Sequence, residues 1–364
     1  MKLITVFEIP LPDDNEIEET LVQYAKDYHL DSFDDGLLSE LTLAFKGLST
    51  FEIVQILNLA YQQQSGQING SDKELILREK ELSIKKSGLL EAIHVDETVN
   101  IGGLENLVRY LKRKAKIYAD LNKALKAGVD LPKGILVVGM PGCGKSLAAK
   151  KTAKEFNVPL FRLDVGTLLG KYVGESEENL RRAIRIAEAA TPCVLWIDEI
   201  EKAFADVGKD EGGGGVTTRL FGYFLTWMQE KKSTVYVVAT ANSLTGIPPE
   251  FLRKGRFDEL FTVNLPNREE RKKIFRIHIS RRKPNWRSLG INLNELAKKT
   301  AGDDGENTFS GADIESIVKT AIETAFEDDR ELTQKDILDA RCHRYLRRRN
   351  IDLSHYALLR FWRH

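Results

Sequence analysis

The eight residues GMPGCGKS, from Gly139 to Ser146, constrain this chain more than any other feature of its sequence. They follow an apolar run of β type, residues 135–138, and precede an alanine-rich segment of helical character. In that context the glycines let backbone N–H groups point at an anion, Lys145 reaches the β- and γ-phosphates of a nucleotide, and the Ser146 hydroxyl can bind Mg²⁺. The sequence therefore predicts a phosphate-binding loop. The residues expected to contact ATP in this segment are Pro141, Gly142, Cys143, Gly144, Lys145, Ser146 and Leu147.

A second apolar run, residues 193–197, ends in two carboxylates, Asp198 and Glu199. After a phosphate-binding loop, such a pair is typical of nucleotide hydrolysis. Asp198 would hold Mg²⁺ together with Ser146, directly or through water, and Glu199 would polarise the water that attacks the γ-phosphate. Two acids can also merely cap a strand in a solvated loop, but the upstream motif argues against that reading. Glu199 predicts a hydrolase rather than a passive nucleotide sensor.

The charges of the chain balance but are unevenly spread. The 54 basic and 54 acidic residues leave no global field that would favour nucleic acid or a membrane. Residues 341–364, however, hold seven arginines and one acid, while residues 8–19 hold six acids and no basic residue. The arginine-rich end carries Tyr345, Phe361 and Trp362 between its charges, which is compatible with nucleic-acid binding or with docking on a neighbouring subunit. Neutral overall charge favours docking or a solvated face.

Cysteine, histidine and hydropathy patterns exclude several other classes. The three cysteines fall at unrelated spacings, so they form neither a disulfide framework nor a zinc site, which fits a reducing compartment. The six histidines form no cluster and no HExxH motif, so no metal beyond Mg²⁺ is expected. No apolar run approaches the ~20 residues that span a bilayer. We expect a cytoplasmic protein, or one of the plastid stroma if it is organellar, with no membrane partner.

Periodicity predicts the organisation of the chain. Residues 1–93 are expected to form a mostly helical domain and linker, with helix starts at Asp13, at Ser49 and at Ser71. Residues 94–265 alternate strands and helices, which predicts an α/β domain with a parallel, doubly wound sheet. Residues 266–346 are expected to form a small helical lid, with helix starts at Asn267 and Ser310, and residues 347–364 a basic tail. The expected strands are 135–138, 160–164, 193–197, 235–240 and 260–263.

Residues 97–340 resemble the AAA ATPase module, a P-loop NTPase fold, in several further motifs. These are 99–104 (VNIGGL), 238–242 (VATAN), 252–258 (LRKGRFD), 277–278 (IH) and 310–313 (SGAD). The resemblance implies that Asn242 senses the γ-phosphate and that Arg253 and Arg256 are arginine fingers. It also implies that Ile101, Gly102, His278, Gly311 and Ala312 border the adenine and the ribose.

Arginine fingers would make assembly part of the mechanism. Phosphoryl transfer spreads negative charge over the γ-oxygens, and a guanidinium from a neighbouring subunit stabilises it. The resemblance thus implies a homo-oligomeric ring, a hexamer. The alternative is that the two arginines only form surface ion pairs.

A segment after the second expected strand, residues 160–164, resembles the aromatic pore loop of AAA unfoldases and severing enzymes. It comprises Lys171, Tyr172 and Val173, followed by Gly174. Six copies facing a channel would grip an extended polypeptide through aromatic and apolar contacts. Tyr172 could instead pack within its own domain. The favoured function is ATP-driven remodelling or threading of a protein substrate; the alternative is a nucleic-acid-associated ATPase acting as a clamp or switch.

Within the family, segments 36–57, 161–166 and 192–204 are similar to those of chloroplast-encoded and cyanobacterial AAA proteins of unassigned role. In that group more sequence usually precedes the segment that matches residues 1–90. We therefore expect this chain to be shorter than its relatives or truncated.

Overall fold

The structure is a computed structural model that describes residues 12–30, 33–63, 68, 75–76, 78–79, 88–96, 101–168, 175–203, 214–244, 247–301 and 309–348. The chain divides into two compact units. The first contains residues 1–97, 111–136 and 152–260, and the second contains residues 98–110, 137–151 and 261–364. Each unit is described by itself.

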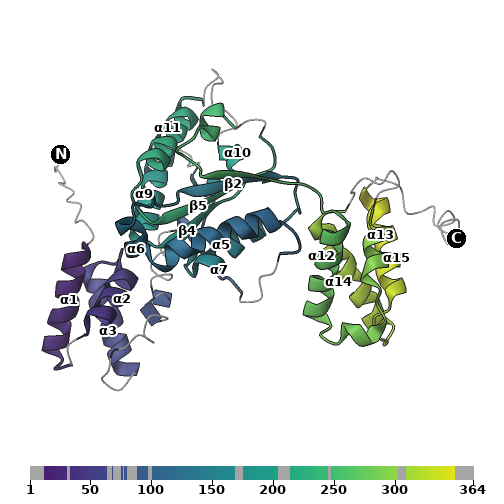
Figure 1. The fold of residues 1–364 in the computed structure, drawn as a ribbon, viewed down its shortest axis with the longest axis horizontal. Coiled ribbons are helices and arrows are strands. Elements are labelled where there is room, and N and C mark those ends of the chain that lie inside the picture. Colours follow the sequence, from purple (N-terminus) through teal and green to yellow (C-terminus); the bar gives the residue numbers. More distant parts are fainter. Residues whose placement is uncertain are drawn as a thin grey trace, which may run out of the picture. The chain divides into compact units, whose positions relative to one another are not determined.

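The first unit begins with three helices, α1 (Asp14–Asp27), α2 (Asp35–Phe45) and α3 (Thr50–Gln63) (Figure 1). Capping boxes start α1 at Asp13 and α3 at Ser49, as their sequences predict. The helices enclose a core of their own that includes Ile17, Leu21, Leu41, Phe45, Ile53 and Leu57. The helix expected to start at Ser71 lies mostly outside the described residues.

The turn between α2 and α3 contacts the end of α9 (Glu175–Ala189). Gly47 has φ +86°, and a Cβ atom at this position would lie 1.7 Å from the carbonyl oxygen of Ala189. Only glycine allows the two backbones to approach this closely. The N-terminal helices and α9 therefore meet through main-chain atoms.

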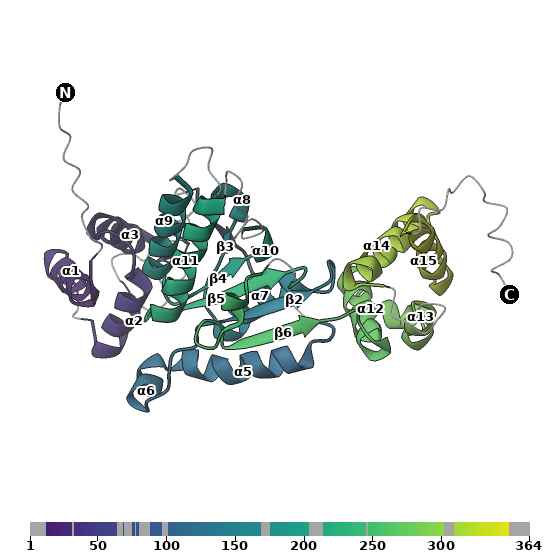
Figure 2. The same cartoon turned by 90° about the horizontal axis from the view of Figure 1, so that it is seen from above.

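A six-stranded sheet has the order β1-β3-β4-β5-β2-β6 (Figure 2). β3 (Leu160–Leu163), β4 (Cys193–Ile197) and β5 (Val235–Ala241) are parallel neighbours, and the other strands are β1 (Leu90–Ile93), β2 (Gly134–Gly139) and β6 (Glu259–Val263). All five expected strands are present. β1 was not predicted, and it pairs antiparallel with β3, so the sheet is mostly rather than wholly parallel.

Helices cover both faces of this sheet, with α5 on one side and α9 and α11 on the other (Figure 2). Every residue of β4 and β5 is buried, as in a doubly wound architecture. The helices associated with the sheet, besides α9, are α5 (Glu105–Ala119), α6 (Leu121–Lys126), α7 (Lys145–Phe156), α8 (Val165–Leu168), α10 (Ile200–Ala203), α11 (Gly214–Glu230) and the 3₁₀ helix η2 (Pro249–Leu252).

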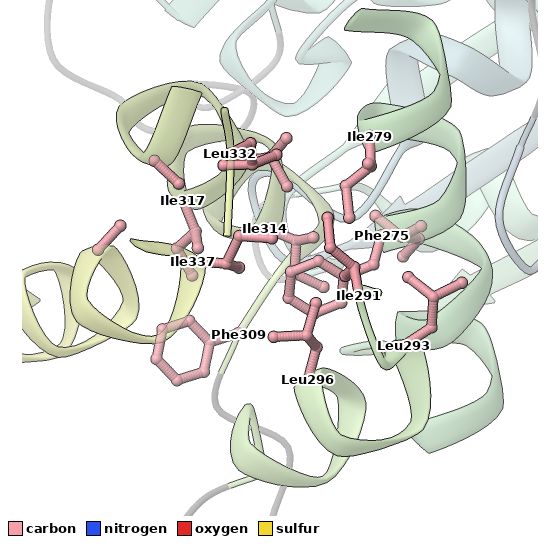
Figure 3. Packing of buried hydrophobic residues seen from close by; sticks show 14 of the residues in the cluster. Phe275, Ile279, Ile291, Leu293, Leu296, Phe309, Ile314, Ile317, Leu332 and Ile337 are labelled. Atoms are coloured by element: carbon pink, nitrogen blue, oxygen red, sulfur yellow. The ribbon is translucent and has the colours of Figure 1, made fainter. Parts of the chain in front are cut away.

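The second unit ends in the expected small helical domain. Its helices are α12 (Arg268–Arg282), η3 (Trp286–Leu289), α13 (Leu293–Lys299), α14 (Gly311–Glu327) and α15 (Gln334–Arg348). Figure 3 shows their shared core, which includes Phe275, Phe309 and Ile314. Capping boxes at Asn267 and Ser310 start α12 and α14, as their sequences predict.

Candidate nucleotide-hydrolysis site

The loop that joins β2 to α7 is held against the start of α14. Gly142 and Gly144 have φ values of +79° and +94°, which only glycine adopts without strain. The Ala312 backbone N–H donates to the Gly142 carbonyl oxygen at 3.1 Å. A Cβ atom at position 142 would lie 2.8 Å from Oγ of Ser310, so the lid helix requires glycine here. The structure thus brings Gly142 together with Gly311 and Ala312.

Lys145 opens α7 and spans the same loop. Its side chain is buried, and Nζ donates to the carbonyl oxygens of Gly139 at 2.7 Å and Met140 at 3.0 Å. Ser146 and Leu147 follow on the first turn of α7 and are exposed, and Pro141 is exposed beside them. An ammonium group and a helix N-terminus at one loop form a site suited to phosphate groups.

The predicted adenine-bordering residues lie along α12. A Cβ atom at Gly102 would fall 2.7 Å from Cγ1 of Ile274, so the backbone of this entry segment packs directly on the helix. Glu105, at the start of α5, pairs with Lys273 at 2.5 Å and thereby ties the next helix to α12. The half-buried Ile101 precedes Gly102.

His278 lies one turn further along α12. Burial lowers the pKa of its imidazole, although Glu315 acts in the opposite direction from 3.8 Å. Its Nδ1 atom is buried and has no hydrogen-bond partner among the described residues. A buried nitrogen without a partner is costly unless a ligand satisfies it. This atom fits the predicted role of His278 beside a nucleotide base.

The acidic half of the candidate site lies at the end of β4. Ile197 pairs with Ala239 in the sheet, so the next residues, Asp198 and Thr240, lie opposite each other. The fully buried Thr240 hydroxyl donates to Oδ1 of Asp198 at 2.6 Å. This bond fixes the carboxylate, whose Oδ2 accepts no hydrogen bond from the described residues. An oriented carboxylate with an open oxygen has the chemistry that Mg²⁺ prefers.

Glu199 sits at the sharp turn from β4 into α10. Its φ of +51° is rare for a residue with a side chain, so the surrounding contacts must hold it. Asn242 Nδ2 donates to Oε1 of Glu199 at 3.1 Å, and Lys202 Nζ pairs with Oε2 at 2.5 Å. The same Asn242 Nδ2 donates to Oε1 of Glu201 at 2.9 Å. The predicted sensor and the predicted catalytic base are therefore in contact.

Three members of this network were not predicted from the sequence: Thr240, Glu201 and Lys202. Glu201 and Lys202 follow the acidic pair directly, so their position in α10 offered a signal. Thr240 offered less, because it lies 42 residues from Asp198 in the chain and meets it only through strand pairing. The carboxylate of Glu199 raises the pKa of Lys202, which keeps the pair charged.

The predicted fingers follow η2. Arg253 is exposed, whereas Arg256 is half-buried and donates to the carbonyl oxygen of Glu250. Stacking of Phe251 on Phe257, with ring centroids 5.4 Å apart, holds the segment. The predicted pore residues Lys171, Tyr172 and Val173 lie outside the described residues.

Comparison with known families identifies the class. Residues 135–265 match the model of the ATPase family associated with various cellular activities (AAA), and residues 290–339 match the AAA+ lid domain. Residues 15–87 match the second domain of SpoVK-like AAA ATPases. The chain belongs to the AAA ATPase family, a family of ATP hydrolases. This finding confirms the predicted α/β P-loop fold with a helical lid and the predicted enzyme class.

Individual relatives agree with this assignment. The chain is 40% identical to proteins named "Uncharacterized AAA domain-containing protein ycf46" from Pyropia yezoensis, over 92% of this chain and 66% of the relative, and from Gracilaria tenuistipitata var. liui, over 93% and 67%. It is 32% identical to "Cell division control protein 48 homolog C" from Arabidopsis thaliana, over 92% of this chain and 44% of the relative. The chain thus spans about two thirds of the length of the first two relatives. Among the described residues, no helix combines the length and apolar character needed to cross a bilayer.

Proposed function

We propose that this chain is a Mg²⁺-dependent ATPase that acts in a homo-oligomeric ring, a hexamer, and uses hydrolysis to remodel or thread a protein substrate. The observation that carries the proposal is the contact of Glu199 with Asn242 beside the fixed carboxylate of Asp198. Glu199 contacts Asn242, the predicted γ-phosphate sensor, so a change at the γ-phosphate could reach the catalytic base through Asn242. Membership of the AAA family supports the same reading.

The phosphate-binding loop would hold ATP. Lys145 would exchange its two carbonyl partners for β- and γ-phosphate oxygens, and the start of α7 would add backbone N–H donors. Gly311 and Ala312, which already pack on the loop, would border the sugar, with His278, Ile101 and Gly102 along the base. Neutral His278 can accept or donate at Nδ1 without bringing a charge into a half-buried position.

Hydrolysis would use the acidic half. Ser146 and Asp198 would hold Mg²⁺, which, when bound, neutralises charge that develops on the phosphate oxygens. Glu199 would accept a proton from the attacking water, and Asn242 would keep its carboxylate aligned. Lys202 holds the other carboxylate oxygen of Glu199 in an ion pair. Arg253 and Arg256 would act on the γ-phosphate of a neighbouring subunit.

Two substitutions test the assignment of the nucleotide site. We expect Glu199→Gln to retain ATP affinity but lose turnover, because an amide keeps the shape yet cannot accept the proton. Lys145→Ala should instead weaken ATP binding, since it removes the charge that holds the phosphates. Nucleotide affinity and phosphate release should be measured on the same preparations, with exposed Glu230→Gln as a control. Normal hydrolysis by Glu199→Gln would refute the role of Glu199.

The type of substrate is tested by stimulation of the ATPase. An unfolded polypeptide should raise the turnover rate of the full chain, and Tyr172→Ala should abolish that rise while leaving basal turnover and melting temperature near wild type. A salt-sensitive rise with DNA or RNA in place of polypeptide would favour the nucleic-acid clamp. The cytoplasm or the plastid stroma remains our prediction for where the protein works.

A further inference from the structure

The chain has no net charge, but it contains one acidic region and one basic region. Residues 12–63, which form α1 to α3, contain eleven acidic residues and only two lysines. Residues 341–364 contain seven arginines and one acid. Two segments of opposite sign in one chain attract each other wherever they can meet.

The acidic helices carry an open groove. Tyr24 donates to Oδ1 of Asn58 at 2.9 Å, and the Tyr28 ring lies tilted against the Tyr61 ring with centroids 5.2 Å apart, so α1 and α3 run side by side in the same direction. The groove along α1 and the start of α3 has a volume of about 1650 Å³ and is lined by Pro12, residues of α1, Leu38, Ser49, Thr50, Phe51 and Val54. Figure 1 shows the two helices next to each other.

The groove presents apolar side chains to solvent. Phe51 is 69% exposed, Tyr28 is 41% exposed and Val22 is 39% exposed, and all three line it. Most other apolar residues of these helices pack in or against their own core, and Leu59, which is 39% exposed, lies outside the groove. Exposed aromatic and aliphatic groups in one groove are typical of a surface that another segment covers.

Carboxylates also line the groove beside these apolar groups. Glu18 and Glu19 line the groove and form no ion pair or hydrogen bond with the described residues. By contrast, Asp14 pairs with Lys46 at 2.7 Å, and Glu16 belongs to the capping box of α1. The groove thus offers acidic and apolar contacts to the same ligand, which suits arginine beside aromatic residues.

We propose that this groove binds the C-terminal segment of the chain, residues 349–364. That segment carries three arginines, Arg349, Arg360 and Arg363, against one acid, Asp352, and it places Phe361 and Trp362 between the last two arginines. Sixteen residues reach about 50 Å when extended, whereas α1, with 14 residues, is about 21 Å long, so the segment can follow the whole groove. Residues 1–11 contain one lysine and no arginine and match the charge of the groove poorly.

Site-specific photocrosslinking in the full chain tests the proposal. A benzophenone amino acid at Phe51 should yield crosslinks that peptide mapping places within residues 349–364. The same group at Leu125, which is exposed on α6, serves as the control position and should not mark that segment. Crosslinks from position 51 only to residues 1–11, to another segment or to nothing would overturn the proposal.

Variants that reverse or remove charges provide the second measurement. Glu18→Arg with Glu19→Arg should lower the crosslink yield at least about fivefold, as should Arg360→Ser with Arg363→Ser. Glu40→Arg, exposed on α2 outside the groove, is the matched control and should change the yield little. Raising salt from about 0.05 to about 0.5 M should reproduce the loss. A yield that is unaffected by both double variants would refute the role of the charges and with it the proposed occupant.

Discussion

Thr240→Val removes one hydroxyl from the acidic half of the site and leaves the shape of the side chain nearly unchanged. The hydroxyl is fully buried and donates to a carboxylate at 2.6 Å, which makes this a charge-assisted hydrogen bond. Bonds of this kind contribute about 1.5–3 kcal/mol. Because Asp198 itself is only half-buried, solvent can replace part of this bond, and the lower end of that range applies.

A loss of about 1.5 kcal/mol corresponds to about a tenfold change in an equilibrium constant. We therefore expect Thr240→Val to raise the Mg²⁺ concentration for half-maximal ATPase about tenfold, while ATP affinity without Mg²⁺ stays near wild type. Thr240→Ser, which keeps the hydroxyl, should restore most of the loss. The assay is a Mg²⁺ titration of phosphate release at saturating ATP, with the melting temperature of each variant recorded. A Thr240→Val protein that folds normally and shows the wild-type Mg²⁺ midpoint would refute the argument that this bond positions Asp198.

Three further predictions concern other contacts. Lys202→Met should raise basal ATP turnover about two- to threefold, since an exposed ion pair restrains Glu199 only weakly; a fall in turnover would instead make Lys202 part of the catalytic machinery. Arg256→Ala should bind ATP normally but hydrolyse it slowly, and mixing it with Lys145→Ala subunits should restore part of the activity, whereas no recovery in mixed rings would argue against action between subunits. Arg330 lowers the pKa of Asp336 from 3.8 to about 2, so this pair stabilises the lid above pH ~4, and the contribution is lost as pH falls toward 2. Asp336→Asn should therefore reduce the free energy of unfolding by about 1–2 kcal/mol at pH 7 and by little near pH 2. Chemical denaturation at the two pH values measures this difference.

The sequence predicted the parts of this molecule that depend on local pattern. Apolar runs marked all five central strands, and capping residues such as Ser49, Asn267 and Ser310 marked helix starts, because both signals act within a few residues. β1 escaped prediction because it has four residues, only the first of them buried, and gains its place by pairing with β3.

In the candidate site, too, local sequence motifs could be predicted, whereas contacts between distant segments could not. The phosphate-binding loop and the acidic pair are contiguous motifs and could be named from the sequence. Contacts between distant segments could not, because the bond from Thr240 to Asp198 depends on strand register and the packing of Gly142 on Ser310 depends on where α14 begins. The groove on α1 and α3 was also unforeseen, since only the fold shows which side chains the three-helix core leaves exposed.

The close approach of Gly47 to Ala189 has a mechanical consequence. α9 begins at Glu175, directly after the segment predicted to line a central pore, and its last residue meets the α2–α3 turn. A helix of 15 residues is a stiff rod about 22 Å long. Gly47 has no side chain that could change rotamer when α9 moves. A displacement of α9 along its axis is therefore transmitted directly to the backbone of the N-terminal helices. Any larger residue at position 47 would force these two parts of the chain to separate.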